Sequence, residues 1–386
     1  MGYEDVAWAS HHEVGEASRT QLRRHRGPYR AAIPARIAQL PVVLAPDVVA
    51  HSTDAASEVA RFDAELGSEI APFAAVLLRS ESAASSQIEN LTASARAIAE
   101  AELGERSGVN AAMVVGNTAA MSAAIALSDD VSARTILDMH AALMSRTDPE
   151  GAGHWRDQQV WIGGSRLGPH SAMFVPPVHD RVPGFIDDLV AFIARDDVPV
   201  LAHAALAHAQ FETIHPFEDG NGRTGRALVH AMLRGKGLTR TVTVPISAGL
   251  LVDTSSYFEA LTDYRSGSPE AIVERFSDAA FASVVNGRAL VKDLRALRSQ
   301  WDSRIRARRG AAAWRVADLL LRQPVINVGL VAGELHVAAQ NVYRVLEPLL
   351  EAGVLVTSGA RRDRIWWAPE VLTAVDAFAA RAGRRG

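Results

Sequence analysis

The sequence predicts a mainly α-helical protein with one small β-hairpin and a separate C-terminal unit of different character. Alanine-rich stretches with apolar residues three and four positions apart recur between residues 54 and 236, which is the spacing of a buried helical face. One short segment near residues 157–178 instead combines β-type residues with paired glycines. Beyond Arg304 both the charge and the order of the expected elements change.

The composition indicates a globular chain of two or three domains, because 386 residues exceed one ordinary domain and 48% of them are hydrophobic. The chain contains no cysteine, which excludes disulfides, thiolate nucleophiles and cysteine-ligated zinc and fits a cytoplasmic protein. A net charge of −4 gives no general attraction to nucleic acid or anionic lipid. The longest uncharged stretch, residues 107–128, is alanine-rich and contains Asn110 and Asn117, so we expect a buried helix rather than a membrane span.

The helical elements of the main body are predicted from this apolar spacing. They are the segments 54–66, 92–102, 111–127, 134–144, 183–194, 202–214 and 224–236. Residues 160–162 and 173–175 break the helical pattern, because they are β-type runs on either side of Gly163 and Gly164. Such runs around glycine turns predict a hairpin or an extended flap at about residues 157–178.

The C-terminal unit, residues 304–386, carries thirteen arginines, seven acids and no lysine, so its net charge is +6 while the rest of the chain carries −10. Helical patterns at 314–321, 327–335 and 338–352 precede strand-like runs at 354–356 and 365–367. A helix-turn-helix followed by a β-hairpin is typical of a winged helix-turn-helix domain. We therefore predict such a domain over residues 310–372, followed by a basic C-terminal tail over residues 373–386.

One loop, residues 215–226 with the sequence HPFEDGNGRTGR, combines the elements of a phosphate site. An apolar helix ends at Pro216, two glycines follow, and a new helix begins. Gly220 and Gly222 allow main-chain N–H groups to turn toward one point, where the helix N-terminus adds partial positive charge. The loop therefore predicts an anion site suited to phosphate.

Charged side chains of the same loop predict the chemistry of the site. Asp219 is a hard oxygen ligand of the kind that holds Mg²⁺ against phosphates. Arg223 and Arg226 are three residues apart, so they lie on one helical face and can donate to the distal phosphates. His215 precedes the loop and is placed to take a proton from an incoming hydroxyl.

The loop resembles the signature of the Fic family, His-Pro-Phe-x-(Asp/Glu)-Gly-Asn-Gly-Arg-x-x-Arg, and every defined position matches. The resemblance implies a Fic-type helical core over residues 111–300 and a protein adenylyltransferase activity. In that activity, His215 deprotonates a Ser, Thr or Tyr hydroxyl of a target protein, whose oxygen attacks the α-phosphorus of ATP. Asp219 is implied as the Mg²⁺ ligand. The implied nucleotide-binding residues are Phe217, Gly220, Asn221, Gly222, Arg223 and Arg226.

Two segments upstream resemble further parts of the family. Trp161, Ile162 and Gly163 resemble the target-docking flap, which holds an extended peptide by edge-strand pairing. Residues 85–90, SSQIEN, resemble the inhibitory motif Ser/Thr-x-x-x-Glu-Gly/Asn. Its matching positions are Ser85, Glu89 and Asn90.

The inhibitory motif implies an arrangement that joins distant parts of the chain. The N-terminal helical region, residues 1–110, would contain the inhibitory helix at about residues 80–91. Glu89 would then form an ion pair with Arg226 and take its guanidinium away from the γ-phosphate of ATP. The resemblance therefore implies a transferase that is inhibited from within its own chain.

His203 and His208 raise the question of a metal site together with His215. Their spacings of five and seven residues do not place three imidazoles on one helical face. We therefore expect the first two to have packing or hydrogen-bonding roles.

Three interpretations of the function remain open. AMP transfer is the leading one, and a de-AMPylating hydrolase or dual-function enzyme, in which Glu89 positions a water, is the second. The third is a DNA-binding regulator, supported by the positive C-terminal unit and by Arg361, Arg362 and Arg364 in the expected wing. Expected partners are ATP, a target protein and the chain itself through automodification, with a homodimer and DNA as further candidates and no membrane.

Overall fold

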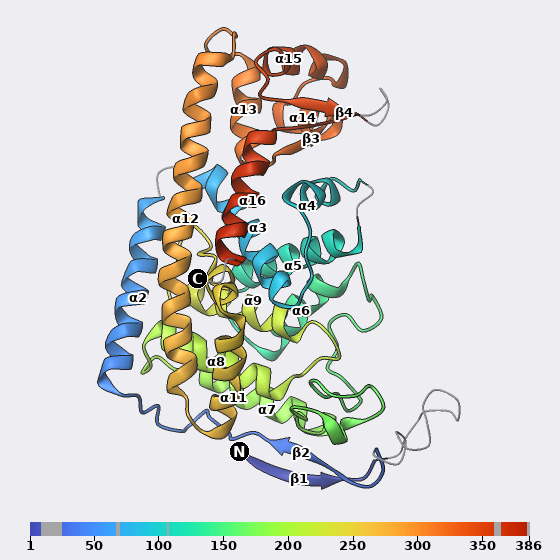
Figure 1. Ribbon diagram of the computed structural model, residues 1–386, viewed down its shortest axis with the longest axis vertical. Helices are drawn as coiled ribbons and strands as arrows, with labels where there is room; N and C mark the ends of the chain where they lie inside the picture. Colours follow the sequence, from blue (N-terminus) through green and yellow to red (C-terminus); the bar gives the residue numbers. More distant parts are fainter. Residues whose placement is uncertain (9–24, 67–69, 106–107, 359–363, 384–386) are drawn as a thin grey trace.

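The computed structural model describes residues 1–8, 25–66, 70–105, 108–358 and 364–383, and these residues are mainly helical (Figure 1). The main body contains the elements β1 (Gly2–Val6), β2 (Tyr29–Ile33), α2 (Pro46–Glu65), α3 (Ile70–Ile88), α4 (Ala95–Glu102), α5 (Val109–Ala126), α6 (Ala133–Met144), α7 (Val182–Ile193), α8 (Val200–Ile214), α9 (Asn221–Gly235), α10 (Ile246–Val252), α11 (Thr254–Ser266) and α12 (Glu270–Arg304). Each of the seven helices predicted from apolar spacing overlaps one of these helices.

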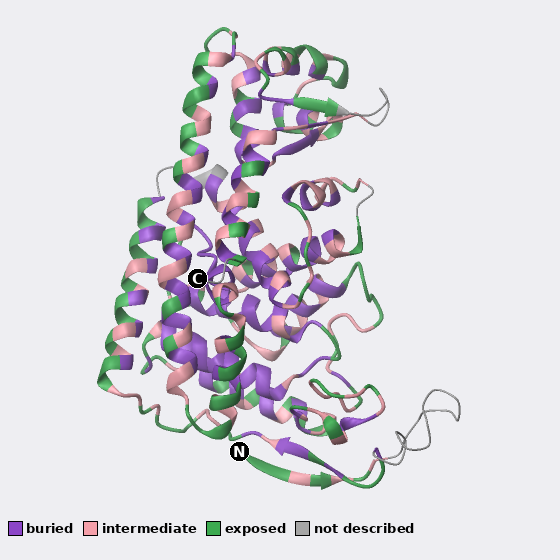
Figure 2. Cartoon of the chain, viewed as in Figure 1, coloured by how far each residue is buried: buried purple, intermediate pink, exposed green. Residues whose placement is uncertain are grey.

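The core of the main body surrounds α8, which is buried on all sides from Leu201 to Ile214 (Figure 2). Alanines at five of these positions allow α7, α9, α11 and α12 to approach it. A helix that is apolar all round is typical of the centre of a domain. The loop that follows α8 is therefore held on a rigid base.

Helix α12 is the longest helix of the described chain, with 35 residues and a length of about 52 Å at 1.5 Å per residue. It packs against α2, α8, α10 and α11 and continues to the C-terminal unit (Figure 1). Its buried residues recur at helical spacing from Ile272 to Trp301. This helix, α10 and α11 were not among the elements predicted from the sequence.

The N-terminal region is not wholly helical, which corrects the prediction for residues 1–110. Strands β1 and β2 form an antiparallel ladder in which Gly2 pairs with Ile33 and Val6 with Tyr29. Arg181 holds β1 through two hydrogen bonds of 2.7 Å to the carboxylate of Glu4. Five-residue strands that pair across an intervening segment carry too little periodicity to be recognised in the sequence.

The C-terminal unit contains α13 (Ala312–Arg322), β3 (Val325–Asn327), α14 (Val328–Leu335), α15 (Ala339–Glu351), β4 (Val356–Ser358), β5 (Ile365–Trp367) and α16 (Pro369–Gly383). Its three strands form an antiparallel sheet in the order β3-β5-β4. The assignment as a winged helix remains a prediction. Arg361 and Arg362 of the expected wing lie outside the described residues.

Residues 373–383 of the expected basic tail instead belong to α16, which packs against α3, α10 and α12, while Arg384 and Arg385 lie outside the described residues. Val371, Ala374, Phe378 and Ala382 are buried on one side of this helix. Their spacing of three and four residues is that of a helical stripe, and the tail prediction wrongly gave more weight to the arginines than to this stripe. Helix α16 thus returns the chain to the main body.

Arg79 of α3 joins this helix to the rest of the molecule. Its guanidinium donates two hydrogen bonds of 2.8 Å to the carboxylate of Glu102 in α4. It also donates to the main-chain oxygen of Arg322 and to Oε1 of Gln323, both at 2.9 Å. Because the last two residues lie at the end of α13, α3 is bonded directly to the C-terminal unit.

Helix α5 has the length and apolar character of a membrane span, and 44% of its residues are buried inside the molecule. It packs against α3, α4, α6 and α9. Asn117, which is fully buried, donates hydrogen bonds to Ser82 and Ser86 of α3. These contacts agree with the predicted buried helix.

Candidate active site

A cavity of about 720 Å³ opens where α8 ends and α9 begins. His215 caps α8 in the left-handed conformation, with φ 50°, and Pro216 prevents the helix from continuing. Gly220, with φ 76°, turns the chain into α9. No side chain of the described residues caps α9, so the first N–H groups of this helix remain available for an anion in the cavity.

Asn221 holds the loop in this shape. Its side-chain oxygen accepts a hydrogen bond of 2.9 Å from the main-chain N–H of Phe217, and its amide donates one of 2.8 Å to the main-chain oxygen of Phe217. The residue is 3% exposed. The side chain of Asn221 thus braces the loop, and because the residue also lines the cavity, its role in nucleotide binding remains a prediction.

Phe217 was expected to bind the nucleotide, but its side chain is fully buried and does not line the cavity. Its ring lies parallel to the ring of His140, with centroids 3.7 Å apart, and also stacks on Trp155. His140 accepts a hydrogen bond from the N–H of Gly153 at Nδ1, so its Nε2 donates to the main-chain oxygen of Asp219. Phe217 and His140 therefore fix the loop from behind.

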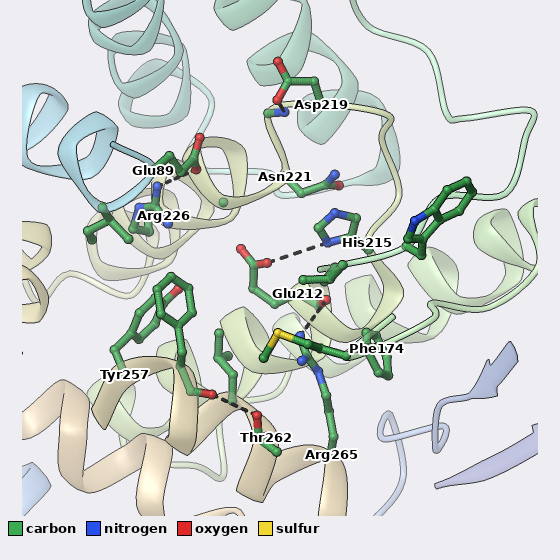
Figure 3. Close-up of a pocket in the computed structure, with 18 of the residues that line it drawn as sticks. Glu89, Phe174, Glu212, His215, Asp219, Asn221, Arg226, Tyr257, Thr262 and Arg265 are labelled. Carbon is green, nitrogen blue, oxygen red and sulfur yellow. Dashed lines mark hydrogen bonds and ion pairs between the residues drawn. The ribbon is translucent and has the colours of Figure 1, made fainter. Parts of the chain in front are cut away.

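His215 lines the cavity, close to the carboxyl group of Glu212 (Figure 3). Nδ1 of the imidazole lies 3.8 Å from Oε2 of Glu212, which is beyond hydrogen-bonding distance. Burial lowers the pKa of His215 to about 3, and the charges of Arg265 and Arg156 act in the same direction. The imidazole is therefore neutral at pH 7 and can accept a proton.

Glu89 meets two arginines of α9, as the sequence predicted for Arg226. Its Oε1 accepts a hydrogen bond of 2.8 Å from the guanidinium of Arg226 (Figure 3). Its Oε2 accepts one of 2.9 Å from Nε of Arg223. Ser85 accepts two further hydrogen bonds of 2.8 Å from Arg226, at Oγ and at the main-chain oxygen. Burial alone would lower the pKa of Arg226, but the charge of Glu89 raises it.

Asn90 explains the Gly/Asn position of the upstream motif. It follows α3 with φ 63°, in the left-handed region that asparagine and glycine adopt most readily. Its N–H bonds to the main-chain oxygen of Gln87 at 2.9 Å. The main chain thus turns at Asn90, immediately after Glu89. This turn sets the direction in which the side chain of Glu89 points.

Asp219 lies at the mouth of the cavity with 61% of its side chain exposed. Its Oδ1 accepts a hydrogen bond from the N–H of Gly220, and its carboxylate is 3.3 Å from the guanidinium of Arg223. Among the described residues no group of three His, Asp or Glu side chains could hold a metal ion. One exposed carboxylate beside a phosphate site nevertheless fits Mg²⁺, which usually binds one or two carboxylates together with substrate phosphates.

The expected flap meets α11 at the cavity, where the guanidinium of Arg265 lies over the ring of Phe174, 4.1 Å from its centroid. Trp161 and Ile162 line the cavity, and Ile162 pairs with Phe174 through an isolated antiparallel bridge. The described chain thus forms one bridge here rather than the two strands of a hairpin. Gly163 adopts φ 72° against the side chain of Met173. A role in docking a target peptide remains a prediction.

Four other side chains near the cavity were not assigned to the site from the sequence. They are Glu212, Tyr257 and Arg265, which line the cavity, and His140, which lies behind the loop. Tyr257 and Arg265 belong to α11, a helix that no sequence motif predicted. The roles expected for His203 and His208 are confirmed, since their Nε2 atoms bond to the main-chain oxygen of Phe192 and to the hydroxyl of Tyr257.

Residues 130–233 match the sequence model of the Fic/DOC family. The chain is 27% identical to "Protein adenylyltransferase fic-1" of Caenorhabditis elegans over 157 residues, which are 38% of this chain and 29% of that protein. It is 32% identical to "Protein adenylyltransferase Fic" of Aedes aegypti over 117 residues, 28% of this chain and 21% of that protein. The chain thus spans less than a third of the length of these two relatives.

The fold as a whole is similar to a solved structure, that of a Fic family protein from Desulfovibrio desulfuricans G20. The TM-score is 0.54 at 19% sequence identity, over 86% of this chain and 98% of the other. At this identity the similarity concerns the fold alone. It extends well beyond residues 130–233 and therefore includes elements on both sides of the matched segment.

Proposed function

The chain carries a Fic domain of the Fic/DOC family at residues 130–233, and on that premise we propose that it is a protein adenylyltransferase. One observation carries the proposal. His215, the uncapped N-terminus of α9 and Asp219 surround a single cavity. A general base, an anion site and a ligand for Mg²⁺ are the three parts that transfer of AMP from ATP requires.

In the proposed reaction, the imidazole of His215 takes the proton of a Ser, Thr or Tyr hydroxyl of a target protein. The oxygen forms a bond to the α-phosphorus of ATP, and the bond from that phosphorus to pyrophosphate breaks. Main-chain N–H groups at the start of α9, near Gly222, stabilise the charge that grows on the α-phosphate. Mg²⁺ held by Asp219 would neutralise phosphate charge when it is bound.

The absence of a side chain at position 222 supports transfer of AMP. A Cβ atom built on Gly222 would lie 2.4 Å from Oε1 of Glu89 and 2.8 Å from the guanidinium of Arg226. A bulky cationic residue at this position would therefore occupy the space next to both groups. With glycine, main-chain N–H groups of α9 are accessible to a phosphate without such crowding.

We also propose that Glu89 inhibits the transfer. Arg226 is 3% exposed, and its guanidinium is occupied by Glu89 and Ser85. The γ-phosphate of ATP needs the same guanidinium. While Glu89 and Ser85 occupy it, ATP would bind without a contact between its γ-phosphate and Arg226. The ion pair thus supports an inhibited state of the chain.

The function is tested with the Glu89→Gly variant and ATP labelled at either the α- or the γ-phosphate. We expect the α label, and not the γ label, to appear on protein in a Mg²⁺-dependent reaction. Intact-protein mass spectrometry then shows the addition of one or more adenylyl groups. Incorporation of the γ label instead would replace the proposal with phosphate transfer, and incorporation of neither label would reject it.

Asp219→Ala is expected to weaken the Mg²⁺ dependence of both ATP binding and turnover, because no other acid of the loop is equally placed. Glu218→Ala is the matched control, since Glu218 accepts a hydrogen bond of 2.7 Å from Gln158 and has no bond within the loop. Both variants are titrated with Mg²⁺ in a transfer assay. A large loss for Glu218→Ala with a small one for Asp219→Ala would reverse the assignment.

Removal of AMP is a second candidate, which one observation favours. Glu89 lines the same cavity as His215 and retains an exposed side-chain fraction of 27%, so it can hold a water near a bound AMP group. Incubating AMP-modified protein with Mg²⁺ and without ATP separates the two activities. DNA binding is not proposed, because the exposed side of α15 combines Arg344 with the acids Glu347 and Glu351.

A further inference from the structure

We propose that Glu212 is the positioning residue of His215. Its carboxylate orients the imidazole through Nδ1 and accepts the hydrogen bond of the imidazolium that forms when Nε2 takes the proton of the acceptor hydroxyl. This inference deepens the proposed transferase function and rests on it.

The two side chains face each other in the last turn of α8 and its cap. Oε2 of Glu212 lies 3.8 Å from Nδ1 of His215, and Figure 3 shows the carboxyl group directed toward the imidazole. Within the described chain, neither Nδ1 of His215 nor Oε1 of Glu212 has a hydrogen-bond partner. Hydrogen bonds of catalytic groups are often long before substrate binds and shorten in the complex. The inference requires a side-chain rotation that closes this gap.

Among the described residues the carboxyl group of Glu212 accepts no hydrogen bond, although its charge favours the charged forms of Arg226 and Arg265. The main chain around His215 is already held, because its N–H bonds to the oxygen of Phe211 and its oxygen accepts from Nε of Arg156. Glu212 contacts Arg265 only through its main-chain oxygen, at 3.4 Å. A carboxyl group that is buried without a hydrogen bond lowers the stability of the fold. The presence of Glu212 is therefore not explained by a stabilising role.

The charges around Glu212 and His215 determine how the carboxylate of Glu212 can stabilise the imidazolium of His215 during the reaction. Burial raises the pKa of Glu212 to about 7, while Arg226 and Arg265 oppose this rise and Glu89 adds to it. Tyr257, the other titratable group that faces it, has a raised pKa and is neutral at pH 7. Burial also disfavours the imidazolium of His215, whose pKa is about 3. A carboxylate next to Nδ1 offsets that cost, as in serine-protease triads.

The proton balance follows from this arrangement. The O–H bond of the acceptor breaks and its proton moves to Nε2 of His215, while the oxygen bonds to phosphorus and pyrophosphate leaves. Nδ1–H of the resulting imidazolium then donates to the carboxylate of Glu212. The ionised form of Glu212 is the competent one, so the rate is expected to rise as the pH increases through about 7.

The test compares Glu89→Gly with Glu89→Gly/Glu212→Gln and Glu89→Gly/Glu212→Asp. Loss of the Glu89 charge lowers the pKa of Glu212, so in the Glu89→Gly chain the rise in rate moves to a pH below 7. We expect Glu212→Gln to reduce kcat by about 100-fold or more and to abolish the rise, with the KM for ATP unchanged. Glu212→Asp is expected to retain the rise at an intermediate rate.

A second readout does not need activity. In ¹⁵N-histidine NMR spectra, with His215 assigned by His215→Asn, Glu212→Gln is expected to shift the Nδ1 signal of His215 and to lower its pKa further. Thermal unfolding and ATP affinity control for misfolding. An unchanged His215 signal together with an unchanged pH profile would overturn the inference. If Glu89→Gly transfers no AMP while the His215 signal still depends on Glu212, the transferase proposal fails and the coupling of the two side chains stands.

Discussion

Replacing His215 with alanine is expected to lower AMP transfer by about 100- to 10,000-fold, which is the usual contribution of a general base. ATP affinity should remain nearly unchanged, because the phosphate contacts come from the first turns of α9 and from Arg226, and the imidazole acts on the acceptor hydroxyl. Transfer is measured with α-labelled ATP in the Glu89→Gly background, and ATP binding by calorimetry. Transfer at the rate of the Glu89→Gly parent would contradict the assignment of the base.

The conformation of residue 215 requires a second variant as a control. His215 has φ 50°, and alanine in the left-handed region costs about 1–2 kcal/mol, so part of the effect in His215→Ala is strain. His215→Asn removes the base but keeps a residue that adopts this conformation readily. Loss of transfer in both variants, with intact folding in His215→Asn, assigns the effect to the missing imidazole.

Glu89→Gly is expected to raise AMP incorporation at least tenfold over the wild-type chain. Arg226 is buried and Glu89 is partly exposed, and removing a competing interaction of only about 1.4 kcal/mol already corresponds to a factor of ten in the binding of a competing phosphate. The free guanidinium of Arg226 can then bind the γ-phosphate. Arg226→Ala in the Glu89→Gly background should reduce incorporation again, because the freed arginine orients the nucleotide.

Two controls separate the loss of charge from the gain of chain flexibility. Glu89→Gln keeps the size of the side chain and removes its charge, so it should activate the chain as well, though less than Glu89→Gly. Glu150→Gly makes the same exchange in an exposed turn away from the cavity and should leave the rate unchanged. Equal incorporation by the wild type and Glu89→Gly would reject the inhibitory role of Glu89 and leave that of His215 intact.

The sequence predicted those parts of the site that are local in the chain. A loop with two glycines between two helices fixes its own shape, so the positions of His215, Asp219 and α9 followed from residues 215–226. The contact between Glu89 and Arg226 spans 137 positions and was predicted from a motif alone. The structure confirms the contact, while its inhibitory effect is still to be tested.

Other parts of the site depend on packing that no local pattern records. Whether the amide of Asn221 faces phosphate or its own loop is decided by the position of the Phe217 main chain. Tyr257 and Arg265 reach the cavity because α11 packs against α8, and that contact leaves no sign in the spacing of the residues. Glu212 is one of five polar residues of α8, with His203, His208, Gln210 and Thr213, so the composition of the helix did not single it out as the neighbour of His215.

The bonds from Arg79 to the end of α13 have a consequence for work with shortened chains. A chain that stops after α12 would lose two of the four hydrogen bonds of this guanidinium, together with the contacts of α16 along α3. The helix that presents Glu89 would then be less firmly seated. If Glu89 inhibits transfer as proposed, such a fragment would be deregulated, and a higher activity in it should not be read as an intrinsic property of the catalytic core.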